Sequence, residues 1–417
     1  MRRLSLFLSL AACCSAYTVQ VIPSFSNATL SNSADTWSSP LGNVVVYAAY
    51  SPQYCALAPE GFTAQNLRLT LSAAPASGKG YTLLVNKTDV DTTLKVPLSG
   101  VQSGSDVTHR VHFAQGDYFC YHFTEQGSPT ALYYSAVVDI VPDTPGHVFL
   151  FGQFNSAAGA LAYIPLTYAT GTSNTESNTY FPMPGTATVI GIAAQVQSAC
   201  TGSAYWKMMV RKNSGDTSLF VNLNAGVTTL QTASGSVGFT AGQLINIAAE
   251  VPAGSCVVTT GGISLVLTMP TMGQFIVGSV RNSNVVNNDY AWVTGRVTGG
   301  SNWNGTESFV QQITDGFQVT AAALQATTAP GGTAYYDFYL RNQPPGGSAS
   351  NVLDLHLSGS NTTATATPTS PPLNMYIGGL MSIQAVPSGS PTNPGQTEWG
   401  FLCYVPPSDS HFLEVMR

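Results

Sequence analysis

The chain repeats one pattern of residues at an interval close to the size of a whole domain. The first copy reads YTLLVNK at 81–87 and DTTL at 91–94, and the second reads YWKMMVRK at 205–212 and DTSL at 216–219. A second marker follows at nearly equal spacing, FAQGDY at 113–118 and FTAGQL at 239–244. An interval of roughly 125–135 residues is too long for the units of a solenoid and matches a complete domain. The sequence therefore predicts tandem domains.

A third and looser copy reads YDFYLRN at 336–342 and GGLMSI at 378–383. The second and third copies also share a VPxGS turn, at 251–255 and 386–390. A glycine opens a strand ahead of each copy, namely Gly61, Gly185 and Gly316. We expect an N-terminal segment at residues 1–16, followed by domains at 17–142, 143–270 and 271–417, the last of them divergent.

Within a copy the hydrophobic residues follow the period of a β-strand. LRLTL at 67–71, LDLHL at 353–357 and VNL at 221–223 alternate apolar and polar residues, as half-buried strands do. Short apolar runs at 44–50, 148–151, 265–269 and 275–277 fit strands covered on both sides, and turn-forming residues separate them. No long stretch shows helical periodicity with caps. About eight strands per copy predict an all-β chain of three tandem antiparallel β-sandwich domains of jelly-roll type.

Charged residues are scarce. They make up 8% of the 417 residues, against about 25% in an average soluble protein, while 44% of the chain is hydrophobic. This apolar content argues against disorder, and the shortage of Glu and Lys excludes a coiled coil. With 14 basic and 20 acidic residues, the chain lacks the basic surface that binds nucleic acid.

Three interpretations fit the N-terminus. Arg2 and Arg3 precede an apolar run at 4–12 and the small residues CCSA at 13–16, which is the pattern of a cleaved secretory signal. The same run suits an uncleaved hydrophobic arm that packs into a neighbouring subunit. LAAC at 10–13 also resembles a lipobox, which would place a lipid on Cys13. The run is too short for a membrane-spanning helix, and no later segment is long and apolar enough for one.

Four cysteines fall as one pair in each of the first two domains. Disulfides Cys55–Cys120 and Cys200–Cys256 would suit an oxidising compartment. The alternative is buried free thiols, since free Cys is often a core residue. Cys403 has no obvious partner.

Four Asn-x-Ser/Thr sequons are candidate glycan sites if a eukaryotic host secretes the chain. Otherwise they indicate polar loops. They lie at Asn27, Asn86, Asn304 and Asn361.

His109 and His112 are the nearest approach to a metal motif. Residues three apart on a strand point to opposite faces, so the two rings would not converge. Asp89 and Asp91 could contact a hard cation, but a turn-forming role is the stronger interpretation, as it is for Asp117.

His122 and Glu125 lie near each other without a nucleophile elbow beside them, and no zinc-protease or phosphate-loop motif occurs. We therefore expect no catalytic, metal or cofactor residues. The aromatic doublets at 133–134, 205–206 and 335–336 would stack on sugars or pack in a subunit interface if exposed, and core packing is the alternative.

The first copy resembles a repeat found in uncharacterised proteins of phages, other viruses and some bacteria. The residues that carry the resemblance are LSAAP at 71–75, GKGYT at 78–82, NK at 86–87, DTTL at 91–94, GSDVTH at 104–109 and AQGD at 114–117. The match is fair in the second copy and poor in the third. The resemblance implies a jelly roll of the tumour-necrosis-factor/C1q kind, often found in trimeric or particle-bound proteins, with a structural or binding role and no catalytic residues.

Together these features favour a non-enzymatic structural protein that assembles with itself or with other structural subunits. It would form part of a virus particle, as a capsid, decoration or fibre component, or of an extracellular filament. The alternative is a secreted or surface-anchored adhesin or carbohydrate-binding protein, with a glycan or cell-surface receptor as its partner. Both interpretations place the chain outside the cell or on the virion surface, without nucleic acid.

Overall fold

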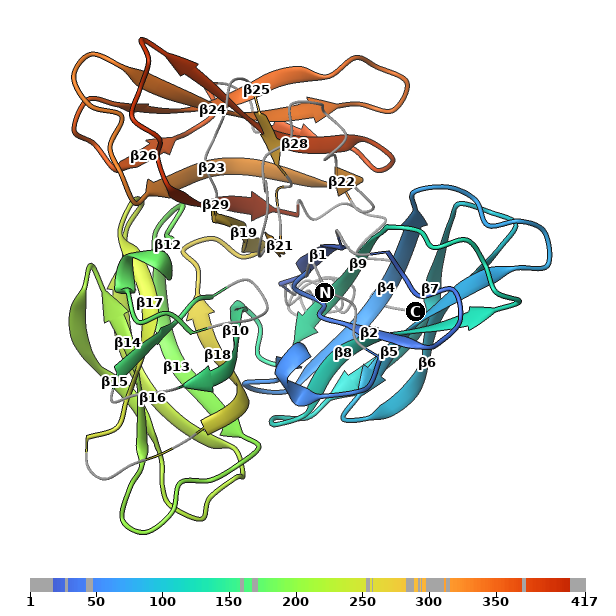
Figure 1. The fold of residues 1–417 in the computed structure, drawn as a ribbon, viewed down its shortest axis with the longest axis horizontal. Coiled ribbons are helices and arrows are strands. Elements are labelled where there is room, and N and C mark those ends of the chain that lie inside the picture. Colours follow the sequence, from blue (N-terminus) through green and yellow to red (C-terminus); the bar gives the residue numbers. More distant parts are fainter. Residues whose placement is uncertain are drawn as a thin grey trace, which may run out of the picture.

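The computed structural model describes residues 18–26, 29–42, 48–157, 161–166, 172–252, 256, 258–282, 289–291, 293, 295–297, 311–312, 316–369 and 373–405. Within these ranges the chain forms strands β1 to β29 and two short 3-10 turns, η1 (Pro52–Tyr54) and η2 (Glu176–Asn178), and no α-helix. The strands build three double-layered sandwiches arranged in a ring (Figure 1). The prediction of an all-β chain of three antiparallel sandwiches is confirmed.

Sandwich 1 has one sheet in the order β1-β9-β4-β7 and a second in the order β2-β8-β5-β6, to which β3 adds by pairing with β8. Its strands are β1 (Gln20–Ser26), β2 (Thr36–Ser38), β3 (Ala56–Leu57), β4 (Phe62–Leu71), β5 (Gly80–Lys87), β6 (Val90–Ser99), β7 (Ser103–Phe113), β8 (Tyr118–Gln126) and β9 (Tyr134–Pro142).

Sandwich 2 has sheets in the orders β10-β18-β13-β16 and β11-β17-β14-β15, with β12 also paired to β17. Its strands are β10 (His147–Ala157), β11 (Leu161–Ile164), β12 (Phe181–Pro182), β13 (Ala187–Val196), β14 (Trp206–Lys212), β15 (Gly215–Leu223), β16 (Gln231–Phe239), β17 (Leu244–Glu250) and β18 (Val258–Thr268).

Sandwich 3 has sheets in the orders β21-β19-β29-β23-β26 and β20-β28-β24-β25, with β27 paired to β23 and β22 to β28. Its strands are β19 (Gln274–Asn282), β20 (Asp289–Ala291), β21 (Gly295–Val297), β22 (Gln311–Gln312), β23 (Phe317–Ala326), β24 (Tyr335–Gln343), β25 (Ser350–Ser358), β26 (Thr363–Ala366), β27 (Leu373–Met375), β28 (Leu380–Ser388) and β29 (Gln396–Tyr404).

All three sandwiches have the nested strand pairing of a jelly roll. In sandwich 1 the first strand pairs with the last (β1–β9), the second with the second-last (β2 and β3 with β8), the third with the sixth (β4–β7), and the middle two form a hairpin (β5–β6). Sandwiches 2 and 3 repeat this order. In each, the sheet that holds the first and last strands is called the inner sheet, because it contacts a neighbouring sandwich, and the other is the outer sheet.

The shared pairing makes residues of the three sandwiches directly comparable. The sixth strand, or its continuation β27 in sandwich 3, ends opposite the first residue of the third strand. The three pairs are Phe113 with Phe62, Phe239 with Ala187, and Met375 with Phe317. Residues that hold the same place when the register is counted from these pairs are called equivalent. Tyr81, Trp206 and Tyr336 are equivalent in this sense, and all three are buried in the core of their sandwich.

The first repeated marker is a tight hairpin turn. Thr88 and Asp89 have φ angles of 48° and 66°, and Asn213 and Ser214 have φ angles of 49° and 65°. Positive φ at both central residues defines the type I′ turn, which suits the right-handed twist of a hairpin. In sandwich 3 a Pro- and Gly-rich loop at 344–349 replaces this turn, which is why the third copy is hard to align.

A threonine just beyond the turn fixes the spacing of the marker. Thr92 donates its hydroxyl to the carbonyl of Val85 at 2.7 Å, and Thr217 donates to the carbonyl of Val210 at 2.6 Å. The same hydrogen bond therefore ties the two strands in both hairpins, next to a bulge in each ladder.

The second marker is a turn that requires glycine. Gly116, Gly242 and Gly378 have φ angles of 91°, 80° and 80°, a region that residues with a Cβ rarely enter. The residue after each glycine donates its N–H to the carbonyl two positions before that glycine, at 2.9–3.1 Å. One turn therefore connects the sixth and seventh strands in all three sandwiches.

The turn that the second and third copies share in sequence is not shared in structure. The VPxGS letters are one residue out of register, because Val386 is equivalent to Glu250 and not to Val251. A one-residue slip moves a side chain to the other face of a strand, so this shared turn is not a structural repeat. Of the strand expected at 44–50, residues 44–47 lie outside the described residues, and residues 48–50 are not in a strand.

Asp106, on β7, links β7 to β6 through its side-chain carboxylate, at the corner where the chain passes from one sheet to the other. Its carboxylate accepts backbone N–H groups of Lys95, Thr108 and His109, each at 3.1 Å, and contacts His109 Nδ1 at 2.9 Å. Burial favours the neutral acid, but these hydrogen bonds outweigh burial and lower the pKa of Asp106. The carboxylate therefore stabilises the corner in its charged form.

We expect Asp106→Asn to destabilise the protein by about 1–3 kcal/mol at pH 7, because a buried acceptor loses charge-assisted hydrogen bonds. Since the folded-state pKa is lowered, this stabilisation is present above the usual pKa of 3.8 and is lost as the pH falls through the folded value. Urea unfolding at pH 7 and at about pH 2.5 measures both effects. A difference from wild type that does not shrink in acid contradicts the assignment, and Asp143→Asn, at a half-exposed carboxylate, is the control.

Candidate functional site: the junction of three jelly rolls

Three equivalent side chains, one on the first strand of each sandwich, cross into the core of a neighbour. Phe149 packs among the core residues of sandwich 1, Ile276 among those of sandwich 2, and Val21 among those of sandwich 3. Each sandwich therefore completes the core of another, and the three contacts close a ring. Figure 1 shows β1, β10 and β19 toward its centre. Their partners on the last strands are Asp139, Val266 and Leu402.

A second set of equivalent residues, on the last strands, makes the same contact. Ser264 donates its hydroxyl to the carbonyl of Leu57 on β3 at 2.6 Å. Gly400 lies against Pro182 on β12, where an added Cβ would come within 2.7 Å of the carbonyl oxygen. Val137 holds this position in sandwich 1 and packs in the core of sandwich 3. In sandwiches 2 and 3 the last strand thus meets the short second strand of the preceding sandwich, and Val137 closes the ring by packing in the core of sandwich 3.

Glycines inside strands allow this close approach. An added Cβ on Gly278 or Gly400 would come within 2.4 Å and 2.8 Å of the Phe181 ring. An added Cβ on Gly262 would come within 2.8 Å of the Leu57 side chain. A glycine in a strand interior often marks a site where another backbone or side chain approaches closely, as it does here.

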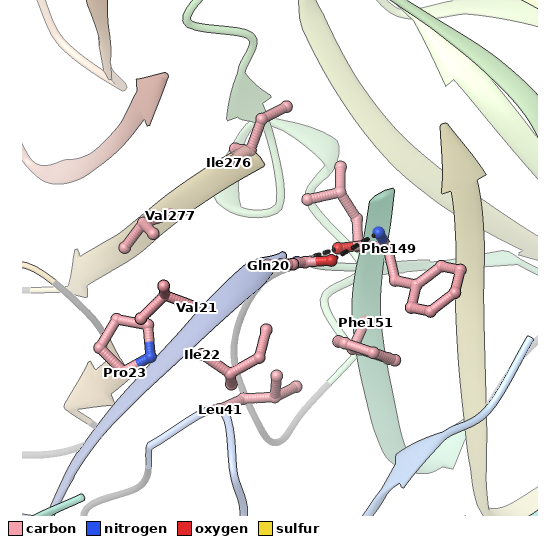
Figure 2. A pocket seen from close by; sticks show the side chains of 11 residues that line it. Gln20, Val21, Ile22, Pro23, Leu41, Phe149, Phe151, Ile276 and Val277 are labelled. Carbon is pink, nitrogen blue, oxygen red and sulfur yellow. Dashed lines mark hydrogen bonds between the residues drawn. The ribbon is translucent and has the colours of Figure 1, made fainter. Parts of the chain in front are cut away.

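The buried side-chain amide of Gln20 hydrogen-bonds the backbone N–H and carbonyl of Phe149, the residue that enters the core of sandwich 1. Gln20 donates Nε2 to the carbonyl of Phe149 and accepts the N–H of Phe149 at Oε1, both at 2.8 Å (Figure 2). Phe149 thereby keeps its backbone hydrogen-bonded on the side that faces sandwich 1. A buried polar group without a partner would cost about 1–3 kcal/mol.

The first strands surround a small pocket at this junction (Figure 2). Its volume is about 30 Å³, whereas pockets for organic ligands measure roughly 300–1,000 Å³. The pocket is therefore too small for an organic ligand, and the residues around it serve as a packing contact. The pocket is lined by Gln20, Val21, Ile22, Pro23, Leu41, Phe149, Leu150, Phe151, Ile276, Val277 and Gly278.

Polar side chains lie beside the link between sandwiches 1 and 2. His147 Nδ1 lies 2.8 Å from Glu60, and His112 Nε2 lies 2.9 Å from Asp143. Burial raises the pKa of Glu60, and Asp143 adds to the effect, while His147 opposes it. Two histidine–carboxylate pairs therefore flank the chain where it passes from β9 to β10.

Three equivalent aromatic residues lie on the outer sheets. Trp37 stacks on His122 with ring centroids 4.0 Å apart, and His122 Nδ1 lies 2.9 Å from Asp91. The other two contact arginines that are equivalent to each other: Arg211 lies over Tyr163 at 5.7 Å and Arg341 over Tyr290 at 5.6 Å. Each ring thus contacts a cationic or imidazole group of its own sandwich, which gives sugar stacking no specific support.

Both expected cysteine pairs are joined in the structure. Cys55–Cys120 and Cys200–Cys256 are disulfides, with Cα atoms 4.6 Å and 5.0 Å apart. Cys403 is a free buried thiol, and burial raises its pKa, which keeps it protonated and unreactive.

The sequons differ in accessibility. Asn86 is fully buried on β5 and donates its amide to Asp91 at 2.9 Å, so the folded chain has no room for a glycan there and this expectation is wrong. Asn361 lies in an exposed turn and stays a candidate. Asn27 and Asn304, and the lipidation candidate Cys13, lie outside the described residues.

The titratable residues considered in the sequence do not converge on one centre. His109 and His112 contact different carboxylates, Asp106 and Asp143. Glu125 accepts the N–H of Ser128 and does not contact His122.

Asp89 lies at the hairpin turn and Asp117 accepts the N–H of Ala114 at 2.7 Å, so both have turn roles. In the aromatic doublets one ring is buried, namely Tyr134, Trp206 and Tyr336, and its neighbour is more exposed.

The junction residues were missed in the sequence analysis because nothing distinguishes them from ordinary core residues of a strand. Val21, Phe149 and Ile276 sit in short apolar runs of the kind that any covered strand contains. The one available signal was glycine within a strand pattern, at Gly262, Gly278 and Gly400.

Comparisons with known proteins identify no family. No protein-family model and no curated protein matches the chain. Among solved structures, a chain from the triple jelly-roll fold and turret assembly of an archaeal virus has 10% identity and a TM-score of 0.21, covering 84% of this chain and 79% of that one. A chain of Sulfolobus turreted icosahedral virus has 9% identity and a TM-score of 0.17, covering 83% and 79%. An insecticidal delta-endotoxin of Bacillus thuringiensis has 9% identity and a TM-score of 0.17, covering 52% and 53%. Similarities this low carry no argument about function, and the specific resemblance to the tumour-necrosis-factor/C1q group stays an expectation.

In the part of the chain that the structure describes, no helix has the length and hydrophobicity needed to span a bilayer.

We expect Phe149→Ala to destabilise the protein by about 3–5 kcal/mol, because it empties a site in the core of sandwich 1 and loosens sandwich 2 from it. Phe220→Ala is the matched control, since that ring is 39% exposed and its loss costs little. Differential scanning calorimetry measures both. Equal effects of the two variants would show that Phe149 does not join the sandwiches.

We expect alkylation of the denatured, unreduced chain to label Cys403 and to leave the four paired cysteines unlabelled. Replacing Cys55 and Cys120 with alanine should cost about 4 kcal/mol, because the disulfide closes a loop of 65 residues. Peptide mass mapping and urea unfolding measure the two outcomes. Labelling of Cys55 or Cys200 before reduction would contradict the pairing.

Proposed function

We propose that the chain is a non-enzymatic structural protein that assembles with copies of itself in a virus particle, as a capsid, decoration or fibre component, or in an extracellular filament. The observation that carries the proposal is the closed ring of three jelly rolls with shared cores. Such a ring is a rigid building block that would meet neighbouring subunits through its end loops and through the parts of its outer sheets away from the junction.

The composition supports assembly. Only 8% of residues are charged, so large surfaces can meet without the desolvation of many ions. The cores of protein interfaces are depleted in charged residues in the same way.

Exposed apolar side chains on the end turns supply contact sites. Tyr376 and Ile377 are adjacent and are 51% and 57% exposed in the turn between β27 and β28. Val101 and Tyr133 are 50% and 45% exposed in neighbouring turns at one end of sandwich 1. Apolar groups presented at the ends of sandwiches are suited to contacts between subunits.

A structural role also fits the chemistry of the polar residues. The described histidines are each paired with a carboxylate on strands or turns, and they lie outside the apolar pocket at the junction. The two disulfides suit an extracellular or virion location.

Self-assembly is tested by light scattering with size-exclusion chromatography, and by negative-stain microscopy, over a range of protein concentrations. We expect assemblies of more than one chain, and we expect Tyr376→Ser with Ile377→Ser to weaken them. Val107→Ser is the control, because Val107 is 44% exposed on the β7 strand and not in an end turn. A strict monomer at every concentration would contradict the proposal.

A further inference from the structure

The outer sheet of sandwich 3 brings three metal-ligating side chains together. Asp337 on β24 lies directly opposite His356 on β25, and Asp354 lies two residues before His356, opposite Tyr339. Residues two apart on a strand share a face, so all three side chains project from the same side of the sheet. One ligand atom from each lies within 4.8 Å of the other two.

Neighbouring contacts hold two of the three ligands in place. His356 Nδ1 lies 2.6 Å from Asp337 Oδ1, and the hydroxyl of Tyr339 donates to Asp337 Oδ2 at 3.2 Å. The Tyr335 ring packs beside the imidazole with centroids 4.9 Å apart. Asp337 is only 15% exposed, whereas His356 is 50% exposed, so the group is fixed on its inner side and open to solvent on its outer side.

The fold does not need these residues. The equivalent positions on the same two strands hold neither a histidine nor a carboxylate in the other sandwiches, whose hairpins form without them. They are Thr82, Lys95 and Pro97 in sandwich 1, and Lys207, Phe220 and Asn222 in sandwich 2. Two carboxylates placed side by side repel each other, and a cation between them removes that repulsion.

We propose that Asp337, Asp354 and His356 bind one divalent metal ion of the Zn²⁺ type. One imidazole nitrogen and two carboxylate oxygens are a donor set that Zn²⁺ accepts, with water in the fourth position of a tetrahedron. Ligand atoms in such a site lie about 3.4 Å apart, so metal binding requires the Asp354 and His356 side chains, both exposed, to rotate from their present separations of up to 4.8 Å. The metal replaces the hydrogen bond between His356 and Asp337 and ties β24 to β25.

The test is a titration of the chelator-treated, full-length protein with Zn²⁺, followed by isothermal calorimetry. We expect one site, whose affinity falls by roughly tenfold or more in Asp354→Asn and in His356→Ala. At one fixed Zn²⁺ concentration, the melting temperature of the wild type should rise by more than that of either variant. His112→Ala is the control, because His112 is 55% exposed, close to the 50% of His356, and pairs with a carboxylate without belonging to a three-ligand group among the described residues.

The proposal is overturned if the wild type binds no Zn²⁺, if Ca²⁺ binds at this site in its place, or if both variants bind Zn²⁺ as the wild type does. Circular dichroism of the zinc-free variants shows that they are folded. Asp354 is exposed and its amide analogue keeps its size, so Asp354→Asn decides the matter if His356→Ala does not fold. Assembly measurements are independent of this result.

Discussion

Each sandwich inserts one apolar side chain into the core of a neighbour, and the rest of the molecule depends on these three contacts. A jelly roll buries its core between two sheets, and its inner sheet would expose Val21, Phe149 or Ile276 if the sandwich stood alone. Each of these side chains is instead buried in the core of another sandwich. Burying a side chain of this size contributes roughly 1.5–3 kcal/mol, and the benefit requires that the neighbour be present. The three sandwiches are therefore one folded body and not independent domains joined by linkers.

The ring is preserved although the residues that form it differ. The crossing side chain is a phenylalanine, an isoleucine or a valine, and the contact position on the last strand is a serine, a glycine or a valine. A large partner is matched by a small one, as Phe181 is by Gly278 and Gly400. Interiors accept such exchanges when the total volume is kept, so equivalent contacts can persist while the sequence similarity that would identify them disappears.

The sequence carries the fold of each sandwich better than it carries their arrangement. Alternation along strands such as 67–71 and the recurring turns at Gly116 and Gly242 depend on local geometry, and they were readable from single segments. The junction depends on which apolar strands of different sandwiches pack together. In the sequence, Phe149 cannot be distinguished from a residue that is buried in its own sandwich. The same limit applies to the Asp337, Asp354 and His356 group, because Asp337 is joined to the other two by strand register and not by spacing along the chain.

Because the three copies are linked in one chain, the residues of each copy can differ from those of the other two. Separate identical subunits would carry every feature three times, whereas here the disulfides belong to sandwiches 1 and 2, and the carboxylate–imidazole group belongs to sandwich 3. In sandwich 3 a longer loop at 344–349 replaces the tight turn between the two central strands, β24 and β25. A metal ion bridging those two strands would restrain the same hairpin that lost its short turn.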